Sequence, residues 1–492
     1  MNGEERRINM RGSITKWVFV VFLSFLLLPG YHSVQAAEME KSVAERIIDI
    51  LKDKGVLKED EYQELKKMVE NEKEQEKKIP RVSFKKGFSL ETPDQEFKLR
   101  ITGRFQTDFK IFDTDNPNNN SFSVRRARLA MGGTMYKYYD FFVETEFGQG
   151  SARLNDGYLN INYTPMMQLR VGQFKEPFSL EELVSDNWTD MIERSLANNI
   201  PPSRDIGAMI HGDLYSGALN YAVAVYNGRS INQQTDTDDD KDMAGRIIFA
   251  PFQLLGMKEN KFLKDLRLGA AFTYGYQDSN VTDWWKQGKF KTEATTTFFA
   301  LRDTTTAGKE NYVSQNGKRI RLGAELGYQY DSFSLKGELM KTNLDDLILN
   351  TYNTTLKKVV KSDERDFDVK GGYISASYFL TGEKEPFKNG VYDAITPKKK
   401  FDPFQGTWGA WQIAFRYSFL SVDRDLFKYG YADPKKYTDK ADAYTAGVNW
   451  YLNDMVRIMV NYIHTSFDDD VEVSGKKIDN EDVFITRFQI VW

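Results

Sequence analysis

Basic side chains recur at alternate positions in many segments of this 492-residue sequence. On an extended chain, alternate side chains share one face, so these groups gather on one side of a sheet. A guanidinium group can hold phosphate or carboxylate through two parallel hydrogen bonds, and a row of such groups concentrates anions. The residues of this kind are Arg100, Arg104, Arg126, Arg128, Arg170, Arg246, Arg267, Arg319, Arg321, Lys336, Arg416, Arg457 and Arg487.

Acidic residues on the same face offer an alternative, in which the arginines are neutralised and line a general pore. Asp140, Glu144 and Glu146 stand on the segment that follows Arg126 and Arg128, where they can pair with these arginines. Acidic residues on this face are nevertheless fewer than basic ones. The formal net charge of −4 arises elsewhere, notably at positions 236–240 and 468–470. We therefore favour a basic surface that attracts anions.

Catalytic and metal-binding chemistry finds little support in the sequence. The chain contains no cysteine, which excludes a disulfide scaffold, a thiolate metal site and a cysteine nucleophile. His211 and His464 belong to no recognisable arrangement of a serine with a histidine base. We therefore expect no enzyme activity, no catalytic residue, no metal, no cofactor and no nucleic-acid partner.

The N-terminal segment indicates export from the cytoplasm. A basic stretch over residues 6–16 precedes an apolar run over residues 17–29, and small residues at 34–36 offer a cleavage site. This is the layout of a secretory signal peptide. The apolar run is shorter than the ~20 residues that a transmembrane anchor needs. We predict a signal peptide over residues 1–36.

Residues 37–80 show a helical period that the rest of the chain lacks. Apolar residues from Val43 to Leu51 fall at helical spacing, and Gly55 supplies a C-terminal cap. A second helical stretch follows and ends in a charged run before Pro80. We expect a short helical hairpin or coiled-coil strand that self-associates in the periplasm. Contact with the cell wall or a periplasmic partner is the alternative.

Beyond residue 95 the period of the apolar residues changes to two. The chain is 14% aromatic, and after the N-terminal segment no run is long and apolar enough for a membrane helix. These features predict an all-β domain over residues 95–492, a transmembrane antiparallel β-barrel of about 16 strands. Such a barrel closes because open edges fail in lipid, and it leaves a water-filled lumen. We assign the aromatic and aliphatic face of each strand to outer-membrane lipid.

Connector lengths support this topology. Tight turns at 137–139, 164–166, 215–217, 331 and 453–454 alternate with longer polar connectors such as 278–317, 342–366 and 466–481. An even strand count with short periplasmic turns places the N-terminal extension and the C-terminus in the periplasm. Residues 293–302 are the best candidate for an additional strand. The last strand alternates toward lipid and ends on the aromatic Trp492.

The third outer connector, from Lys175 to Pro202, is long enough to fold inward and narrow the channel. The run from Ser179 to Glu182 fits a capping box that opens a short helix. Alternatively, the connector merely covers the barrel mouth. Its candidate pore groups are Lys175, Ser185, Arg194 and Arg204.

Six short motifs follow one another along the barrel segment. They are Val124-Arg125-Arg126-Ala127 with Gly132-Gly133, Leu169-Arg170-Val171-Gly172-Gln173-Phe174, Ile192-Glu193-Arg194-Ser195-Leu196, Leu380-Thr381-Gly382-Glu383, Gly409-Ala410-Trp411 and Gly447-Val448-Asn449-Trp450-Tyr451. In this order and spacing they resemble the phosphate-selective porins O and P. The resemblance implies a trimeric sixteen-stranded barrel that passes phosphate or pyrophosphate along basic residues, with a constriction formed by the third loop.

The resemblance also assigns individual residues. It implies that Arg125 with Arg126, Arg194 and Ser185 bind the anion. Glu182, however, stands where the family has a lysine, and Asp186 stands where it has a second serine, which weakens the expected phosphate binding. Strict alternation places Arg126 and Arg128 in the lumen and Arg125 toward lipid, so a bulge near residue 125 is needed to turn both neighbours inward. The competing functions are a general, weakly selective porin and a structural barrel that anchors the helical segment.

Overall fold

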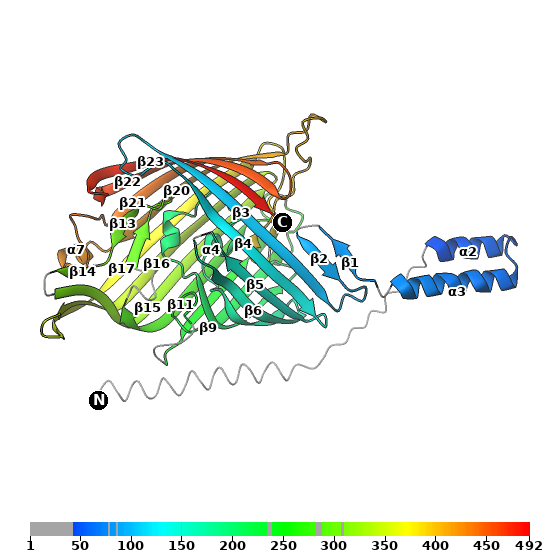
Figure 1. The fold of residues 1–492 in the computed structure, drawn as a ribbon, viewed down its shortest axis with the longest axis horizontal. Helices are drawn as coiled ribbons and strands as arrows, with labels where there is room; N and C mark the ends of the chain where they lie inside the picture. Colours follow the sequence, from blue (N-terminus) through cyan, green and yellow to red (C-terminus); the bar gives the residue numbers. More distant parts are fainter. Residues whose placement is uncertain are drawn as a thin grey trace. The chain divides into compact units, whose positions relative to one another are not determined.

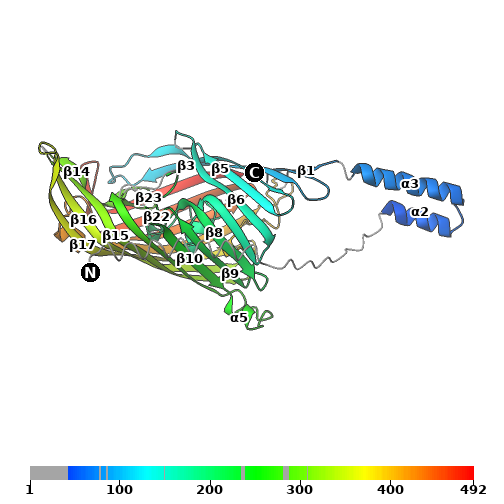
Figure 2. The same cartoon turned by 90° about the horizontal axis from the view of Figure 1, so that it is seen from below.

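The computed structural model describes residues 43–76, 79–84, 87–148, 150–233, 239–280, 288–306 and 309–492. The predicted signal peptide over residues 1–36 therefore lies outside the described residues. Two helices come first, followed by two short strands and then by long strands that form a barrel (Figure 1). Figure 2 shows the same barrel turned by 90°, with its tilted strands following one another around the wall.

Sixteen strands form the wall of the barrel, as the alternation predicts. They are β3 (Lys98–Phe112), β4 (Ser121–Met135), β5 (Tyr139–Glu146), β6 (Arg153–Thr164), β7 (Met167–Lys175), β8 (Arg204–Leu214), β9 (Leu219–Tyr226), β10 (Asp242–Phe249), β11 (Arg267–Asn280), β15 (Lys309–Tyr330), β16 (Phe333–Asn353), β17 (Lys358–Phe379), β20 (Ala410–Val422), β21 (Lys440–Tyr451), β22 (Val456–Val473) and β23 (Lys476–Val491).

The barrel closes because its last strand pairs with its first. β23 runs antiparallel to β3, with Arg487 opposite Asp108 and Val491 opposite Arg104. This closure leaves no unpaired edge to face lipid. Residues 293–302 add no strand to the wall: β12 (Lys289–Lys291) and β13 (Thr297–Ala300) form a separate two-stranded sheet.

The remaining elements lie in connections or before the barrel. They are α2 (Val43–Asp53), α3 (Glu59–Glu76), β1 (Arg81–Ser83), β2 (Phe88–Glu91), α4 (Leu180–Leu183), η1 (Leu196–Asn199), α5 (Pro251–Leu254), β14 (Asp303–Thr306), β18 (Phe387–Lys388), β19 (Val391–Tyr392) and α7 (Asp425–Lys428).

Helices α2 and α3 form the predicted helical hairpin. Gly55 ends α2 with a φ of 71°, a conformation that glycine adopts at little cost. The Tyr62 hydroxyl of α3 donates to the Asp49 carboxylate of α2 at 3.0 Å. Among the described helices, none combines the length and the apolar character needed to cross a membrane.

The prediction of long polar loops at 342–366 and 466–481 is wrong. β16 extends to Asn353 and β17 begins at Lys358, so only residues 354–357 connect the two strands. β22 and β23 likewise leave only residues 474–475 between them. These strands run well past the ~25 Å of an apolar band, and polar side chains suit their outer ends. Their composition resembles that of a loop although their backbone stays paired.

Some aromatic side chains share the inward strand faces with the basic residues. Tyr158 lies on the inward face of its strand, where its ring contacts Phe142, Phe174 and the Arg170 guanidinium. Phe174 in turn packs against Tyr226 at a centroid distance of 5.4 Å. An aromatic ring can therefore line the lumen where it has other rings and a cation to pack against.

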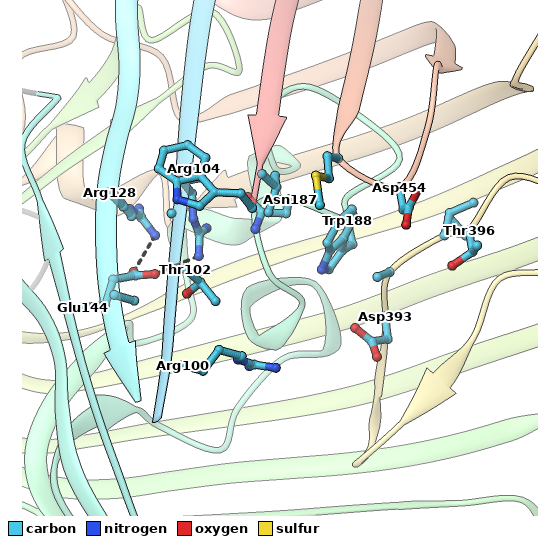
Figure 3. Close-up of a pocket in the computed structure, with 17 residues that line it drawn as sticks. Arg100, Thr102, Arg104, Arg128, Glu144, Asn187, Trp188, Asp393, Thr396 and Asp454 are labelled. Atoms are coloured by element: carbon cyan, nitrogen blue, oxygen red, sulfur yellow. Dashed lines mark hydrogen bonds and ion pairs between the residues drawn. The ribbon is translucent and has the colours of Figure 1, made fainter. Parts of the chain in front are cut away.

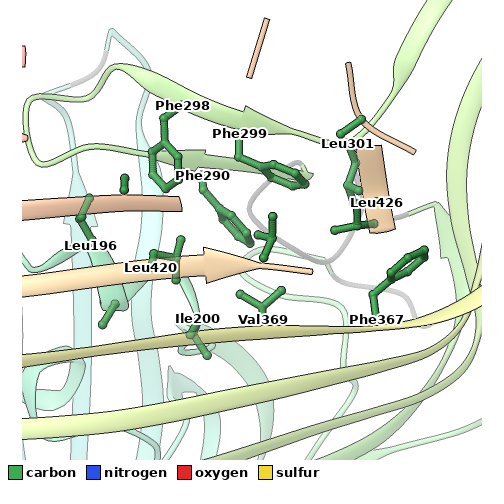
Figure 4. Close-up of a cluster of buried hydrophobic side chains, with 14 of the residues drawn as sticks. Leu196, Ile200, Phe290, Phe298, Phe299, Leu301, Phe367, Val369, Leu420 and Leu426 are labelled. Carbon is green, nitrogen blue, oxygen red and sulfur yellow. The ribbon is translucent and has the colours of Figure 1, made fainter. Parts of the chain in front are cut away.

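One part of the barrel interior is filled by apolar side chains (Figure 4). We call the inward faces of β16, β17, β20 and β21 that build it the apolar wall. Val369 and Leu420 belong to this wall. They pack with Leu196 and Ile200 from the third loop and with Phe298 of β13. Burial of these groups fixes the third loop against one side of the barrel.

Candidate functional site

The third loop, residues 176–203, folds into the barrel. Most of its side chains are buried. This confirms the prediction that the connector folds inward and excludes the alternative that it only covers the barrel mouth. The Ser179 hydroxyl accepts from the Glu182 N–H at 3.2 Å and so caps α4. The N–H groups of Leu180 and Glu181 donate to the Glu338 carboxylate at 3.0 and 2.7 Å, which anchors the start of the loop to β16.

Inward-facing residues of several strands hold the rest of the loop. Lys336 binds the Asp190 carboxylate at 2.8 Å. Arg457 donates to the carbonyl oxygen of Thr189 at 3.0 Å, and Arg487 donates to that of Ile192 at 2.6 Å. These bonds satisfy loop carbonyls that water cannot reach, and they give the loop one defined path through the barrel.

A cavity of about 850 Å³ lies between the third loop and strands β3 to β10. We call the inward faces of these strands the cationic wall. Five acidic side chains line the cavity: Asp140, Glu144, Asp156, Asp186 and Asp213. Six basic ones do so: Arg104, Arg128, Arg170, Lys175, Arg204 and Arg246.

The Asp186 carboxylate of the third loop lies among four guanidinium groups. Its distance is 2.6 Å to Arg194, 3.2 Å to both Arg126 and Arg128, and 3.7 Å to Arg104. Burial raises the pKa of the Asp186 carboxyl, but the charges of Arg126, Arg194 and Arg128 outweigh it and hold this pKa well below its usual range. The surrounding guanidinium charges therefore favour the ionised form of Asp186.

Strand carboxylates neutralise part of the same cluster. Glu144 binds Arg104 at 2.8 Å and Arg128 at 3.1 Å, and Glu146 binds Arg128 at 2.5 Å. The alternative of local neutralisation thus holds for Glu144 and Glu146. Asp140 takes no part in it, because it accepts from Thr134 and Asn160 instead. Figure 3 shows Glu144 between the two arginines, with Asn187 and Trp188 of the third loop nearby.

Arg125 and Arg126 both lie inside the barrel. Arg125 donates to both carboxylate oxygens of Glu193 on the third loop, at 2.8 and 3.0 Å. Phe122 stacks on the outward-facing ring of Phe109, whereas Arg126 faces inward, so the alternation changes phase between residues 122 and 126. This phase change is the irregularity that the sequence requires near residue 125.

Lys175, Ser185 and Arg204 all line the cavity, as expected of pore groups. Lys175 donates to the carbonyl oxygens of Glu182 and Val184. Arg204 forms a two-pronged ion pair with Asp156, at 3.0 and 2.9 Å. The hydroxyl of Ser185 accepts from the N–H of Asn187 at 3.4 Å, so it keeps its proton for another partner. Arg194 also donates to loop carbonyls, which ties it to the loop's own fold.

Arg170 differs from the other basic groups around the cavity. Its guanidinium lies 4.3 Å from the ring centre of Tyr158 and 5.6 Å from that of Phe174. No carboxylate oxygen of the described residues lies within 4.0 Å of its nitrogens, and its Nε has no hydrogen-bond partner among them. Arg170 therefore carries a charge that the cavity does not neutralise locally.

The sequence analysis did not identify several carboxylates that bind the basic residues of the lumen, because these carboxylates lie outside the barrel strands. Glu181 and Glu293 bind Arg416 at 2.9 and 2.6 Å, and Glu385 binds Lys336 at 2.6 Å. Glu385 belongs to the 380–409 link, which also packs Tyr392 against Leu180. The length of this link was the one signal of its role, since a tight turn is expected at that barrel end.

Comparison with known proteins agrees with this arrangement. The sequence profile of a family described as phosphate-selective porin O and P matches residues 99–492. Porin O of Pseudomonas aeruginosa is 28% identical over 438 residues, which cover 84% of this chain and 92% of that protein. An uncharacterized protein of Caulobacter vibrioides is 22% identical over 397 residues, which cover 77% and 71%.

Among solved structures, OmpT, an outer membrane protein of Vibrio cholerae, superposes with a TM-score of 0.48 and 10% identity, covering 81% of this chain and 98% of that one. The family profile spans most of the chain and includes all residues of the barrel strands except Lys98, the first residue of β3. The chain therefore belongs to the phosphate-selective porin O and P family.

Proposed function

We propose that this outer-membrane porin passes small anions by passive diffusion along the cationic wall, with phosphate as the leading candidate and pyrophosphate as the next. The observation that supports it most directly is the cavity lining, where basic groups outnumber acidic ones and no carboxylate of the described residues lies within 4.0 Å of Arg170. In a narrow tube with a low-dielectric wall, such a surplus attracts anions and repels cations. The name of the family points the same way.

A general, weakly selective porin is the second candidate. The ion pairs of Arg128 with Glu146 and of Arg204 with Asp156 favour it, because neutralised cations give a channel little preference. A barrel that serves only to anchor the helical hairpin is the third candidate. Any stable conductance of the purified protein in a planar bilayer eliminates that third function.

The reversal potential of single channels across a potassium chloride gradient tests the proposal. We expect a potential of the sign that chloride preference gives, and a decrease of the chloride current when inorganic phosphate is added. A potential near zero with no phosphate effect supports the general porin. A potassium-selective potential overturns the anion proposal.

The same proposal includes the assembly and orientation of the chain. Residues 1–36 act as a signal peptide, residues 37–80 stand in the periplasm with the C-terminus, and residues 95–492 form the porin domain. The proposed partners are small phosphate-like anions, membrane lipid and two further copies in a homotrimer. We also propose that residues 37–80 contact the cell wall or a periplasmic protein. Chemical crosslinking in cells tests both the trimer and this contact, by the size and composition of the crosslinked products.

A further inference from the structure

One carboxylate of the third loop takes the place that an oxyanion would occupy. Four guanidinium groups, from β3, β4 and the loop itself, converge on Asp186 at 2.6 to 3.7 Å. Asp186 is 7% exposed, yet it lines the cavity together with Arg104 and Arg128. Convergent N–H donors in a site shielded from bulk water are what phosphate recognition requires.

We propose that Asp186 is a resident counter-anion that sets how tightly a permeating phosphate-like oxyanion binds in the channel. A solute reaches the arginines only by competing with this carboxylate, so the channel binds it weakly and releases it readily. The inference rests on the proposed anion-channel function and adds the residue that determines its specificity.

The loop backbone holds the carboxylate in this position. Gln106 donates to the carbonyl oxygen of Asp186 at 3.3 Å, and Gln489 donates to that of Asn187 at 3.2 Å. Arg457 fixes the carbonyl of Thr189 three residues further on. A group tethered in place acts at a high effective concentration, so a free anion is a poor competitor while Asp186 keeps its charge.

The arginines differ in how much they depend on Asp186. Arg104 and Arg128 keep the Glu144 carboxylate when Asp186 is neutralised. Among the described residues, Arg126 then keeps only the amide oxygen of Gln106, at 3.0 Å, as a side-chain hydrogen-bond acceptor. Neutralising Asp186 therefore leaves unbalanced guanidinium charge beside Arg104 and Arg128, which line the cavity, and a mobile oxyanion can take the vacated place.

The test uses Asp186→Asn in the full-length protein, with inorganic phosphate as the probe. Single-channel chloride current is recorded at rising phosphate concentration, for the wild type and the variant. Because hydrogen bonds to charged groups are strong, we expect the half-blocking phosphate concentration to fall about tenfold or more in the variant. The chloride preference of the reversal potential should also increase.

Asp190→Asn is the matched control, since it removes the same charge from the same loop four residues away. Lys336 keeps Glu385 at 2.6 Å, and an asparagine oxygen at position 190 can still accept from Lys336 and Gln412, so the loop stays anchored; Asp190 does not line the cavity. We expect this variant to keep the wild-type phosphate block. If both variants gain block equally, general charge in the barrel explains the result and the role of Asp186 is refuted.

The outcomes separate this inference from the function on which it rests. An anion-selective wild type with an unchanged block in Asp186→Asn overturns the counter-anion role and leaves the anion channel standing. A cation-selective wild type overturns both. Asp186→Ser removes the same charge with a smaller side chain, and the same tenfold shift is expected of it, so failure of Asp186→Asn to assemble does not end the test.

Discussion

The two sides of the barrel interior follow the same two-residue alternation, yet they differ in content. On the cationic wall, polar and charged groups such as Arg128 and Arg204 line an open cavity of about 850 Å³. On the apolar wall, Val369 and Leu420 are buried under the third loop and under the phenylalanines of β12 and β13. Strand alternation decides which side chains point inward, and the inserted loops decide whether those side chains meet solvent or a core.

The two walls also have different roles. The apolar wall holds the third loop by non-directional burial, and the cationic wall presents charge to the solute. Changes on the apolar wall should therefore alter the position of the loop and the size of the channel. Changes on the cationic wall should alter selectivity and leave the fold intact.

The largest effect is expected on the apolar wall, for Phe298→Ala. The Phe298 side chain is fully buried in the cluster, and removing such a ring costs about 3–5 kcal/mol. We expect the third loop to loosen, with larger and noisier conductance and faster proteolysis within residues 176–203. Phe415→Ala is the control, because it removes a lipid-facing ring that is 59% exposed. It should leave both the conductance and the rate of proteolysis unchanged. Equal proteolysis of both variants contradicts a role for the apolar wall in holding the loop.

A smaller effect on binding is expected on the cationic wall, for Arg170→Gln. This change removes a charge that has no carboxylate partner among the described residues, so none of their buried carboxylates loses its counter-charge and the barrel should assemble normally. We expect phosphate block to weaken about tenfold, the value of one charge-assisted contact. Arg170→Lys keeps the charge and should retain most of the block. Wild-type block in Arg170→Gln argues that the solute path avoids this arginine.

The smallest effect concerns salt. Raising potassium chloride from about 0.1 M to 1 M shortens the Debye length from about 10 Å to 3 Å, which screens the cationic wall. The chloride preference of the wild type should decline across this range, and the dependence should be shallower in Arg170→Gln. A preference that does not change with salt indicates selection by pore size, independent of charge.

The sequence predicted those features that depend on neighbours along the chain. The sixteen strands follow from local alternation, as in the pair Phe415 and Arg416, and the cap at Ser179 follows from its distance to Glu182. The contact of Asp186 with Arg126 joins residues that are far apart in sequence. It depends on how the loop crosses the lumen, which alternation does not encode.

One error of the sequence analysis has a clear physical origin. The prediction of a loop over residues 342–366 equates polar side chains with irregular backbone, and the structure shows paired strands there. Strands that extend past the apolar band have no apolar surface to cover there, and their backbone pairing continues.

The central claim is that solute passes along the cationic wall and not through the apolar one. Because the chain has no cysteine, single cysteines can be labelled without background. Ala222 lines the cavity and Ala443 lies in the apolar cluster, so Ala222→Cys and Ala443→Cys form a matched pair. A negatively charged, thiol-specific reagent should reduce the single-channel current of Ala222→Cys and leave that of Ala443→Cys unchanged. Reduced current in Ala443→Cys, or in neither variant, would contradict the claim.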